Sequence, residues 1–340
     1  MIRVLIVEDS VTQREIFRRL LENDPELTVV AEARDGREAI TQTAAYQPDV
    51  VLMDIHMPDM DGITATAEIM RICPTPIVVA SATLKKRDVD LAMKAYEAGA
   101  VSVIEKPEGA VLLHLQTIGP KLRRELIAAA VARVRENKTR TPAKKPYPRA
   151  IAPQRISAIG LVASTGGPPV LLEILSALPA PFPIPILLVQ HISHGFEDGF
   201  ARWLSNTSGH QVKVAEYGQL LGPGVWVAPG GRHLSLRNPT RMQLVPGDPG
   251  EIHCPSGDAL FYSLAEILGP RAAGVLLTGM GGDGAAGLLA LKQAGGLTII
   301  QDEESSLIWG MPKTAQQLGA ASLELPPEGI AEILAKLSMV

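Results

Sequence analysis

The stretch Arg155–Pro168, RISAIGLVASTGGP, places a serine directly after an apolar run. The run Ile156–Ala163 predicts a buried strand, and Ser164 begins the turn that leads to a helix opened by Pro168. Glycines permit a sharp turn and the close approach of a substrate, and amides at a helix start attract negative charge. Ser164 is therefore a candidate nucleophile, with a simple helix cap as the alternative.

A histidine and an aspartate follow two further apolar runs. His191 comes just after Ile184–Val189, and Asp283 lies in the glycine-rich loop that follows Ala273–Leu277. In one parallel sheet these loops share an edge with Ser164. Serine needs a base to become a nucleophile, imidazole is suited to that task, and a carboxylate fixes the imidazole tautomer. The three residues therefore predict a Ser-His-Asp site, and the lack of a G-x-S-x-G turn excludes an ordinary α/β-hydrolase.

Two other readings compete for these residues. His191 and His194 have H-x-x-H spacing, which is compatible with a metal, but no pattern supplies a third ligand. Gly279–Gly284 spells G-x-G-x-x-G, with Asp302 about 20 residues further on, as in dinucleotide-binding sites. However, Asp283 would lie inside that turn and repel a pyrophosphate. Both readings are weaker than the hydrolase reading.

Five polar residues follow the apolar runs of the first half of the chain: Glu8, Asp9, Asp54, Ser81 and Lys106. At the carboxyl edge of a parallel sheet they would converge. Crowded carboxylates repel one another unless a cation joins them, and Mg²⁺ prefers hard oxygen ligands. A carboxylate beside Mg²⁺ and lysine can accept a phosphoryl group, because both cations neutralise the developing charge. The alternative is that strand ends are simply polar, an explanation that suits one acid better than five residues at once.

The positions of these residues depend on two α/β sheets. In the first half, five apolar runs alternate with helical patterns such as Ser10–Glu22 and Asp88–Ala98. Continuous runs of Val, Ile and Leu indicate a parallel sheet that is covered on both faces. The predicted strands are Val4–Val7, Thr28–Ala31, Val50–Met53, Ile77–Ala80 and Val101–Ile104. This pattern predicts a flavodoxin-like (βα)5 domain.

The second half repeats the alternation and predicts a doubly wound, mainly parallel α/β domain. The predicted strands are Ile156–Ala163, Ile184–Val189, Val212–Ala215, Val225–Ala228, Ala273–Leu277 and Leu297–Ile300. The predicted helices lie around Pro169–Ala177, Ala259–Leu268, Ala285–Gln293 and Lys313–Leu318. The segment Tyr217–Val245 is richer in Gly, Pro and short alternating runs, which predicts inserted β-hairpins.

A basic, proline-rich linker, Asn137–Arg149, separates the two halves. We expect it to be solvated rather than to bind an acidic partner or nucleic acid. Before it, apolar residues recur every four positions and predict an amphipathic helix that continues past Pro120. These residues are Leu122, Leu126, Ala130 and Val134. The predicted organisation is a first domain over residues 1–124, a helix extension and linker over 125–152, and a second domain over 153–340.

Composition narrows the possible functions. The chain of 340 residues has a formal net charge of -4, which gives no global indication of nucleic-acid or membrane binding. Two cysteines far apart in sequence imply no disulfide framework and fit a reducing compartment. The short apolar start is not a secretory signal, and no run of about 18 apolar residues predicts a membrane span. We therefore expect a cytoplasmic protein without membrane insertion.

The first half resembles the receiver domains of two-component response regulators. The resemblance rests on the residues at the strand ends, on DIHMPDMDG at Asp54–Gly62 and on KP at Lys106–Pro107. It implies that Asp54 is phosphorylated, with a histidine kinase as the phosphodonor. It also implies that Ser81 senses the phosphoryl group and that Lys106 pairs with it.

The same resemblance implies a Mg²⁺ site that phosphorylation requires. Glu8, Asp9 and Asp54 would hold the ion, helped by the main-chain carbonyl of His56. The sequence departs from the family pattern at two positions. Glu8 replaces the commoner aspartate, and Val103 stands where an aromatic residue is usual. Phosphorylation is still expected, whereas the usual aromatic switch is in question.

The second half resembles the output domain of the chemotaxis protein-glutamate methylesterases, the CheB family. Its motifs in order are ASTGGP at Ala163–Pro168, VQHI at Val189–Ile192, VAPGGRHL at Val227–Leu234, HCPSGDALFYSLA at His253–Ala265 and LTGMGGDGAAGL at Leu277–Leu288. The resemblance implies that Ser164, His191 and Asp283 are catalytic. It also implies an oxyanion hole formed by the main-chain amides of Thr165 and Met280, and no cofactor in this domain.

Together the two resemblances imply an esterase that phosphorylation regulates. The implied reaction is hydrolysis of glutamate methyl esters, with deamidation of glutamine, on the cytoplasmic domains of methyl-accepting chemoreceptors. We expect the unphosphorylated receiver to cover the esterase cleft, which His233, His253 and the loop around Asp258 would line. The alternative is a response regulator whose esterase-like half is a binding or scaffold module. No helix-turn-helix pattern or basic face indicates a DNA-binding output.

Overall fold

The computed structural model describes residues 1–22, 24–81, 86–106, 112–134, 155–248 and 250–339. The chain divides into two compact units, Met1–Arg140 and Thr141–Val340, and each is described by itself. The basic linker predicted at Asn137–Arg149 lies outside the described residues. Within those residues, none of the helices combines the length and the hydropathy that a membrane span requires.

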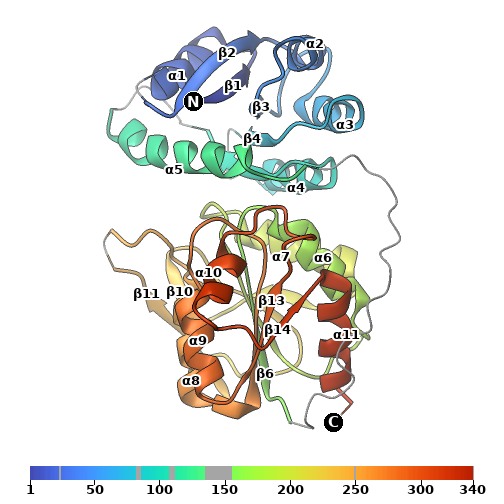
Figure 1. Cartoon of the computed structure of the whole chain (residues 1–340), viewed down its shortest axis with the longest axis vertical. Helices are drawn as coiled ribbons and strands as arrows, with labels where there is room; N and C mark the ends of the chain where they lie inside the picture. Colours follow the sequence, from blue (N-terminus) through green and yellow to red (C-terminus); the bar gives the residue numbers. More distant parts are fainter. Residues whose placement is uncertain (23, 82–85, 107–111, 135–154, 249, 340) are drawn as a thin grey trace. The chain divides into compact units, whose positions relative to one another are not determined.

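Unit 1 is built on a five-stranded parallel sheet in the order β2-β1-β3-β4-β5 (Figure 1). The strands are β1 Ile2–Val7, β2 Leu27–Ala33, β3 Val50–Asp54, β4 Ile77–Ser81 and β5 Ser102–Glu105. Every residue of β3 and β4 is buried, as their unbroken apolar runs lead one to expect. The prediction of a flavodoxin-like (βα)5 domain is confirmed.

Helices connect these strands and cover both faces of the sheet. They are α1 Val11–Glu22, α2 Gly36–Tyr46, α3 Gly62–Ile72, α4 Lys86–Glu97 and α5 Leu112–Ala130. α1 packs beside α5 on one face, and α2, α3 and α4 follow one another on the other face. Aspartates fix two helix starts: Asp35 accepts hydrogen bonds from the amides of Arg37 and Glu38, and Asp61 accepts one from Thr64.

The helix that ends unit 1 differs from its prediction. α5 contains Pro120 within one helix, and Leu122 and Leu126 are buried as their spacing predicts. The prediction that the helix reaches Val134 is wrong, because α5 ends at Ala130. Val131 is already exposed, so a further helical turn would bury little apolar surface. The domain boundary that we predicted after residue 124 falls inside α5.

Unit 2 contains a seven-stranded parallel sheet in the order β14-β13-β12-β6-β7-β9-β8. The strands are β6 Ala158–Ala163, β7 Ile186–Gln190, β8 Val212–Val214, β9 Val225–Val227, β12 Ala272–Leu276, β13 Leu297–Gln301 and β14 Leu323–Leu325. All six predicted strands are present. In the described part of this unit, the antiparallel structure predicted within Tyr217–Val245 consists of one hairpin, β10 Arg232–Asn238 and β11 Arg241–Pro246, and a single antiparallel bridge between Leu220 and Arg241.

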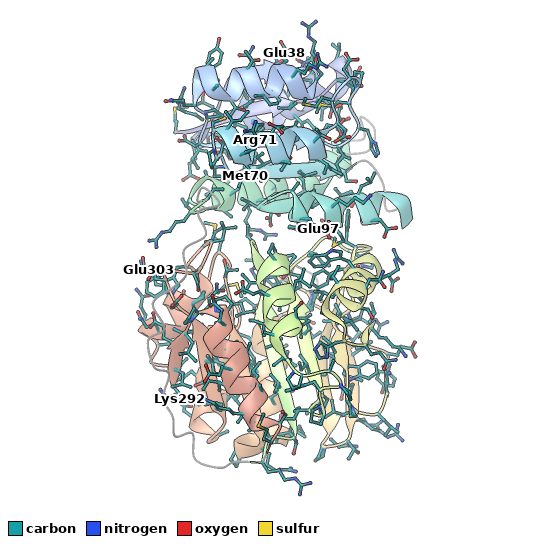
Figure 2. The ribbon with its side chains drawn as sticks, turned by 90° about the vertical axis from the view of Figure 1, so that its right-hand side faces the viewer. Glu38, Met70, Arg71, Glu97, Lys292 and Glu303 are labelled. Carbon is teal, nitrogen blue, oxygen red and sulfur yellow. The ribbon has the colours of Figure 1, made fainter. Side chains whose placement is uncertain are left out.

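Two layers of helices cover this second sheet. They are α6 Gly167–Ala177, α7 Glu197–Ser208, α8 Gly257–Ile267, α9 Ala285–Gln293, α10 Met311–Gln317 and α11 Pro327–Leu337, with the short 3₁₀ helix η1 Gly269–Arg271 after α8. α6 packs against α7 and α11 on one face, and α8, α9 and α10 lie together on the other (Figure 1). Lys292 of α9, labelled in Figure 2, donates hydrogen bonds to the carbonyls of Gly319 and Ala321 at 2.8 and 2.7 Å. This lysine ties α9 to the segment that enters β14.

The strand order of unit 2 reverses at β6. From β6 the sheet continues through β7 on one side and through β12 on the other. Since all three strands are parallel, their carboxyl ends open into three neighbouring loops. In open α/β sheets ligands bind at such a reversal.

Candidate functional site

The loops after β6, β7 and β12 carry Ser164, His191 and Asp283. Main-chain hydrogen bonds hold the first two loops in register with their neighbours. The Ser164 amide donates to the carbonyl of Thr278, and the His191 amide donates to the carbonyl of Ala163, both at 3.0 Å. The sheet therefore brings the three predicted catalytic residues to one edge.

Ser164 lies in the turn between β6 and α6. The N-cap of α6 is Gly166, whose φ of 78° is in the left-handed region that favours glycine, and no side chain caps this helix. The alternative that Ser164 is only a helix cap is therefore wrong. Gln190 donates from Nε2 to the Ser164 carbonyl at 2.9 Å and to the His191 carbonyl at 3.1 Å. One amide side chain thus joins the serine loop to the histidine loop.

Gly279 brings the third loop against the serine. A Cβ atom at this position would lie 2.6 Å from Cβ of Ser164 and 2.3 Å from Sδ of Met311. No side chain fits between these atoms, so only glycine allows the β12 loop to approach Ser164 this closely. Met280, the predicted oxyanion-hole residue, is the next residue in the chain.

His191 and Asp283 form a buried pair. Nε2 of the imidazole lies 2.8 Å from Oδ2 of the carboxylate, and the two side chains are 12% and 8% exposed. Nδ1 of the same ring is buried and has no hydrogen-bond partner within the described part of the chain. A carboxylate only accepts hydrogen bonds, so the Nε2 proton faces Asp283 and Nδ1 keeps a free lone pair. Nδ1 is therefore the nitrogen that can take a proton from a nucleophile.

The amino end of α8 holds Asp283. Oδ1 accepts from the hydroxyl of Ser256 at 2.7 Å and from the amide of Asp258 at 3.2 Å, while Oδ2 also accepts from the amide of Gly257 at 2.6 Å. Burial alone would raise the pKa of Asp283, but hydrogen bonds from His191, Ser256 and Gly257 outweigh it and hold the pKa far below its usual range. The carboxylate is therefore charged at neutral pH and can stabilise a positive charge on His191.

The other residues predicted to line the cleft, His253, Asp258 and His233, make different contacts. The His253 ring stacks on the His191 ring, with centroids 4.4 Å apart and an interplanar angle of 14°. The Asp258 carboxylate instead turns to α9, where it accepts from the amide of Gly287 at 2.6 Å. His233 accepts a hydrogen bond from the amide of Ser256 and pairs with Glu251.

Sequence reasoning missed Gln190 and Ser256. A signal existed for Ser256, because a serine before the apolar helix pattern Ala259–Leu268 is a typical N-cap, and a helix start can bind a carboxylate. No sequence pattern indicated that the carboxylate would be Asp283, since the two residues come from different elements and meet only after α8 packs beside α9.

The structure also weighs against the two competing readings of this half. The ring of His194 is 78% exposed and pairs with Glu197 at 3.1 Å, whereas the Nε2 atom of His191 faces Asp283. The two histidines are therefore engaged separately. The G-x-G-x-x-G loop leads into α9, where the amide of Gly287 already donates to the Asp258 carboxylate at 2.6 Å, and Asp302 accepts a hydrogen bond from its own loop at Ser305.

A second cluster lies at the carboxyl edge of the sheet in unit 1. Glu8 follows β1, Asp54 ends β3, Ser81 ends β4 and Lys106 follows β5, and all four are buried. Nζ of Lys106 lies 2.7 Å from a carboxylate oxygen of Glu8 and 2.7 Å from Oδ1 of Asp54. Asp54 Oδ1 also accepts from the amide of His56 at 3.2 Å. Glu8 and Asp54, two of the predicted strand-end residues, thus meet at the ammonium group of Lys106.

The charges of this cluster are unbalanced. Burial and the nearby Asp54 raise the pKa of Glu8 to about 7, although Lys106 opposes the shift. Burial is also the main reason why the pKa of Asp54 is raised. Ligand oxygens of Glu8, Asp9 and Asp54 lie within 4.8 Å of one another. A set of hard oxygen ligands with surplus negative charge fits Mg²⁺.

Two further positions bear on phosphoryl sensing. Oγ of Ser81 is buried with no hydrogen-bond partner in the described residues, so it is available to a group placed on Asp54. Val103, at the position where the receiver family usually has an aromatic residue, is buried in β5, and its amide donates to the hydroxyl of Tyr96 at 3.2 Å. The buried aromatic ring beside β5 therefore comes from α4.

Comparison with known proteins gives a consistent result for both units. A model of the CheB methylesterase family matches residues 159–334, and a model of the response regulator receiver domain matches residues 4–117. Protein-glutamate methylesterase/protein-glutamine glutaminase 1 of Syntrophus aciditrophicus is 41% identical over 346 residues, which cover 99% of each chain. A similarly named protein, number 4, of Geobacter metallireducens is 42% identical and covers 100% of this chain and 99% of its own.

A solved structure extends the likeness to the fold of unit 2. The crystal structure of the Thermotoga maritima CheB methylesterase catalytic domain has 38% sequence identity and a TM-score of 0.51. The match covers 54% of this chain and 98% of that chain. This agrees with the predicted fold class of the second half.

We predict that Gly279→Ala lowers kcat for ester hydrolysis by about 100-fold, because the added methyl group must displace Ser164 or Met311, and a shift of about 1 Å at a reacting group has that effect. Steady-state kinetics on the full chain would measure it. Gly222→Ala is the matched control, because no atom lies within 4 Å of its added Cβ. A Gly279→Ala enzyme with the kcat of the unmodified chain would contradict the proposed position of Ser164.

A second prediction concerns pH. The pKa of Glu8 rises from 4.5 to about 7 on folding, so the contribution of this group to stability is present below pH 4.5 and is lost as the pH rises through about 7. In EDTA, we expect the thermal midpoint of unit 1 to fall as the pH rises from 4.5 to about 7. In Glu8→Gln, the part of this fall that comes from the titration of Glu8 should be absent. Glu22→Gln, at an exposed helical glutamate, is the control. The same pH dependence in Glu8→Gln would show that Glu8 is not the titrating group.

Proposed function

Because this chain belongs to the CheB methylesterase family, we propose that it hydrolyses glutamate methyl esters on chemoreceptors and that phosphorylation of its receiver domain controls the reaction. The observation that carries the catalytic part is the buried His191–Asp283 pair on the loop edge shared with Ser164. The charged carboxylate fixes the Nε2 proton of the imidazole, and Nδ1, without a partner in the described residues, keeps the lone pair that would accept the proton of Ser164.

The proposed acylation step uses Ser164 as the nucleophile. Its hydroxyl oxygen attacks the ester carbonyl while Nδ1 of His191 takes the hydroxyl proton. The charge on the carbonyl oxygen would be stabilised by the main-chain amides of Thr165 and Met280, and removing one such donor typically costs about 10²–10³ in rate. The tetrahedral intermediate collapses, the C–O bond to methoxide breaks, and His191 gives its proton to the leaving methoxide, releasing methanol.

The proposed deacylation step repeats this chemistry with water. His191 removes a proton from water, the hydroxide attacks the acyl-enzyme, and the bond to Ser164 breaks as the serine recovers its proton. The products are glutamate and free enzyme. A glutamine side chain fits the same sequence with ammonia as the leaving group, which accounts for the proposed deamidation. Asp283 stabilises the imidazolium in each half-reaction without accepting its proton.

The proposed control begins at Asp54. Glu8, Asp9, Asp54 and the main-chain carbonyl of His56 are the residues that we infer to hold Mg²⁺, which when bound supplies positive charge beside the phosphoryl oxygens. Asp54 would take the phosphoryl group from a histidine kinase. The new charge would draw Lys106 away from its shared contact with Glu8 and Asp54, and it would give the Ser81 hydroxyl an acceptor.

We also infer which proteins this enzyme meets, and where. The substrates are the cytoplasmic domains of methyl-accepting chemoreceptors, and the phosphodonor is a histidine kinase of the same signalling system. Both meet this enzyme in the cytoplasm. Neither role requires nucleic acid or membrane insertion.

The direct test of the proposed activity is methanol release from a methylated chemoreceptor cytoplasmic fragment. Ser164→Ala should abolish release, because losing a triad nucleophile costs about 10⁶ in kcat. Ser208→Ala is the matched control, since both serines are 8% exposed and Ser208 donates to the carbonyl of Leu204 in α7 and accepts from the amide of His210. Undiminished release by Ser164→Ala would overturn the catalytic assignment. No release by the unmodified chain would favour the binding or scaffold module.

A separate experiment tests the proposed phosphorylation. A small phosphodonor with Mg²⁺ should accelerate methanol release by the unmodified chain, and Asp54→Asn should remove the acceleration because it removes the phosphoryl acceptor. Asp59→Asn, at a neighbouring exposed aspartate, should respond like the unmodified chain. Acceleration that persists in Asp54→Asn would place phosphorylation elsewhere, and a rate that never responds would contradict control by the receiver.

A further inference from the structure

A second carboxylate–histidine pair, His233 and Glu251, is linked to Asp283 through Ser256. His233 is on β10 and is only 6% exposed, and its Nε2 atom lies 2.8 Å from a carboxylate oxygen of Glu251. Glu251 sits in the segment between β11 and α8, and its side chain is 40% exposed. The mechanism proposed above uses neither residue.

The contacts of His233 fix its proton. The amide of Ser256 donates to Nδ1 at 3.1 Å, so Nδ1 must carry a lone pair. The ring proton is therefore on Nε2, from which it is donated to Glu251. The hydrogen bond from His233 is the main reason why the pKa of Glu251 is lowered, so the acceptor stays charged. Glu251 also accepts from the amide of Asp248 at 2.9 Å, which anchors the carboxylate in its own loop.

Ser256 links this second pair to Asp283. It is the N-cap of α8, and its hydroxyl donates to Asp283, as do the next two amides of the chain. The peptide that His233 holds is thus adjacent to all three donors that α8 gives to the catalytic carboxylate. A rotation of this peptide would move those donors together.

We propose that His233, oriented by Glu251, is a positioning residue for the hydrolysis reaction. It holds the Ser256 peptide so that the amino end of α8 binds Asp283, and Asp283 in turn fixes the tautomer and direction of His191. This inference rests on the proposed roles of Ser164, His191 and Asp283. Both ring nitrogens of His233 are engaged by Ser256 and Glu251, so its contribution is to geometry rather than to bond making.

The same residues invite a different reading. His233, Glu251 and Cys254 each offer a ligand atom, and these atoms lie within 4.8 Å of one another, as in a metal site. The Ser256 amide argues against it. A metal on Nε2 normally leaves a proton on Nδ1, but Nδ1 here faces an N–H donor. A metal would therefore break the hydrogen bond to Ser256 or require an imidazolate.

Two substitutions of one residue separate the two hydrogen bonds. In His233→Asn the amide oxygen can replace Nδ1 as acceptor for Ser256, whereas in His233→Gln the amide nitrogen can replace Nε2 as donor to Glu251. We expect His233→Gln to lower kcat about 10- to 100-fold with little change in KM, because Asp283 is misplaced. His233→Asn should recover most of the loss. Methanol release by the full chain on a methylated receptor fragment is the measurement.

The pH profile supplies a readout that a purely structural role would not move. A misplaced Asp283 stabilises the imidazolium of His191 less, so the acid limb of kcat/KM should shift to lower pH in His233→Gln and stay in place in His233→Asn. Glu251→Leu, at a half-exposed side chain, should shift the limb in the same direction with a smaller loss of kcat. The matched controls are His210→Gln and His210→Asn, because His210 is 7% exposed, like His233, but lies in the α7–β8 loop.

Several results would overturn the inference. Equal losses in His233→Asn and His233→Gln, an unmoved acid limb, or activity that zinc restores after EDTA treatment would each contradict it. Ser164→Ala in the same assay separates this failure from failure of the proposed function. If Ser164→Ala is inactive while the His233 and Glu251 variants behave like the unmodified chain, only the positioning role is lost. If Ser164→Ala stays active, the catalytic assignment itself fails.

Discussion

Unit 2 is organised around one buried negative charge. Asp283 is largely removed from water, and an unpaired carboxylate in such a place would take up a proton. Donors from the amino end of α8 and from His191 keep it ionised. This requirement fixes where α8 must begin, and Gly279 fixes how closely the same loop approaches Ser164. The same hydrogen bonds that keep Asp283 ionised therefore also hold His191 in the orientation expected of a general base.

Unit 1 also buries carboxylates, but their charges are not balanced within the fold. Its carboxylates, Glu8 and Asp54, share one buried ammonium group from Lys106, and burial raises the pKa of both acids. Asp283 is satisfied within the fold, whereas this cluster keeps a surplus of negative charge and a serine hydroxyl, that of Ser81, without a hydrogen-bond partner among the described residues. Such a site is prepared for a cation and for a phosphoryl group, which together would balance it. The charge of Asp283 in unit 2 is thus balanced without a ligand, whereas the charges of the unit 1 cluster would be balanced only when a cation and a phosphoryl group bind.

The sequence predicted the structural features that depend on local patterns. Unbroken apolar runs gave the strands, and parallel strands necessarily bring Ser164, His191 and Asp283 to one edge. It did not predict β14, α7 or α11. The contacts of Ser256 with Asp283, and of His233 with Glu251, join residues 27 and 18 positions apart and depend on tertiary packing. The extension of α5 was overestimated because its spacing did not show where the core ends.

Measuring the tautomer of His191 is the most direct test of whether Asp283 prepares Nδ1 of this histidine as the base for Ser164. The ¹⁵N chemical shifts of its imidazole, assigned in the full chain by comparison with His191→Gln, report which nitrogen carries the proton when the ring is neutral. We predict a protonated Nε2 and an unprotonated Nδ1, with this preference lost in Asp283→Asn. A proton on Nδ1, or the same preference without the Asp283 carboxylate, would contradict the claim that Asp283 prepares Nδ1 as the base for Ser164.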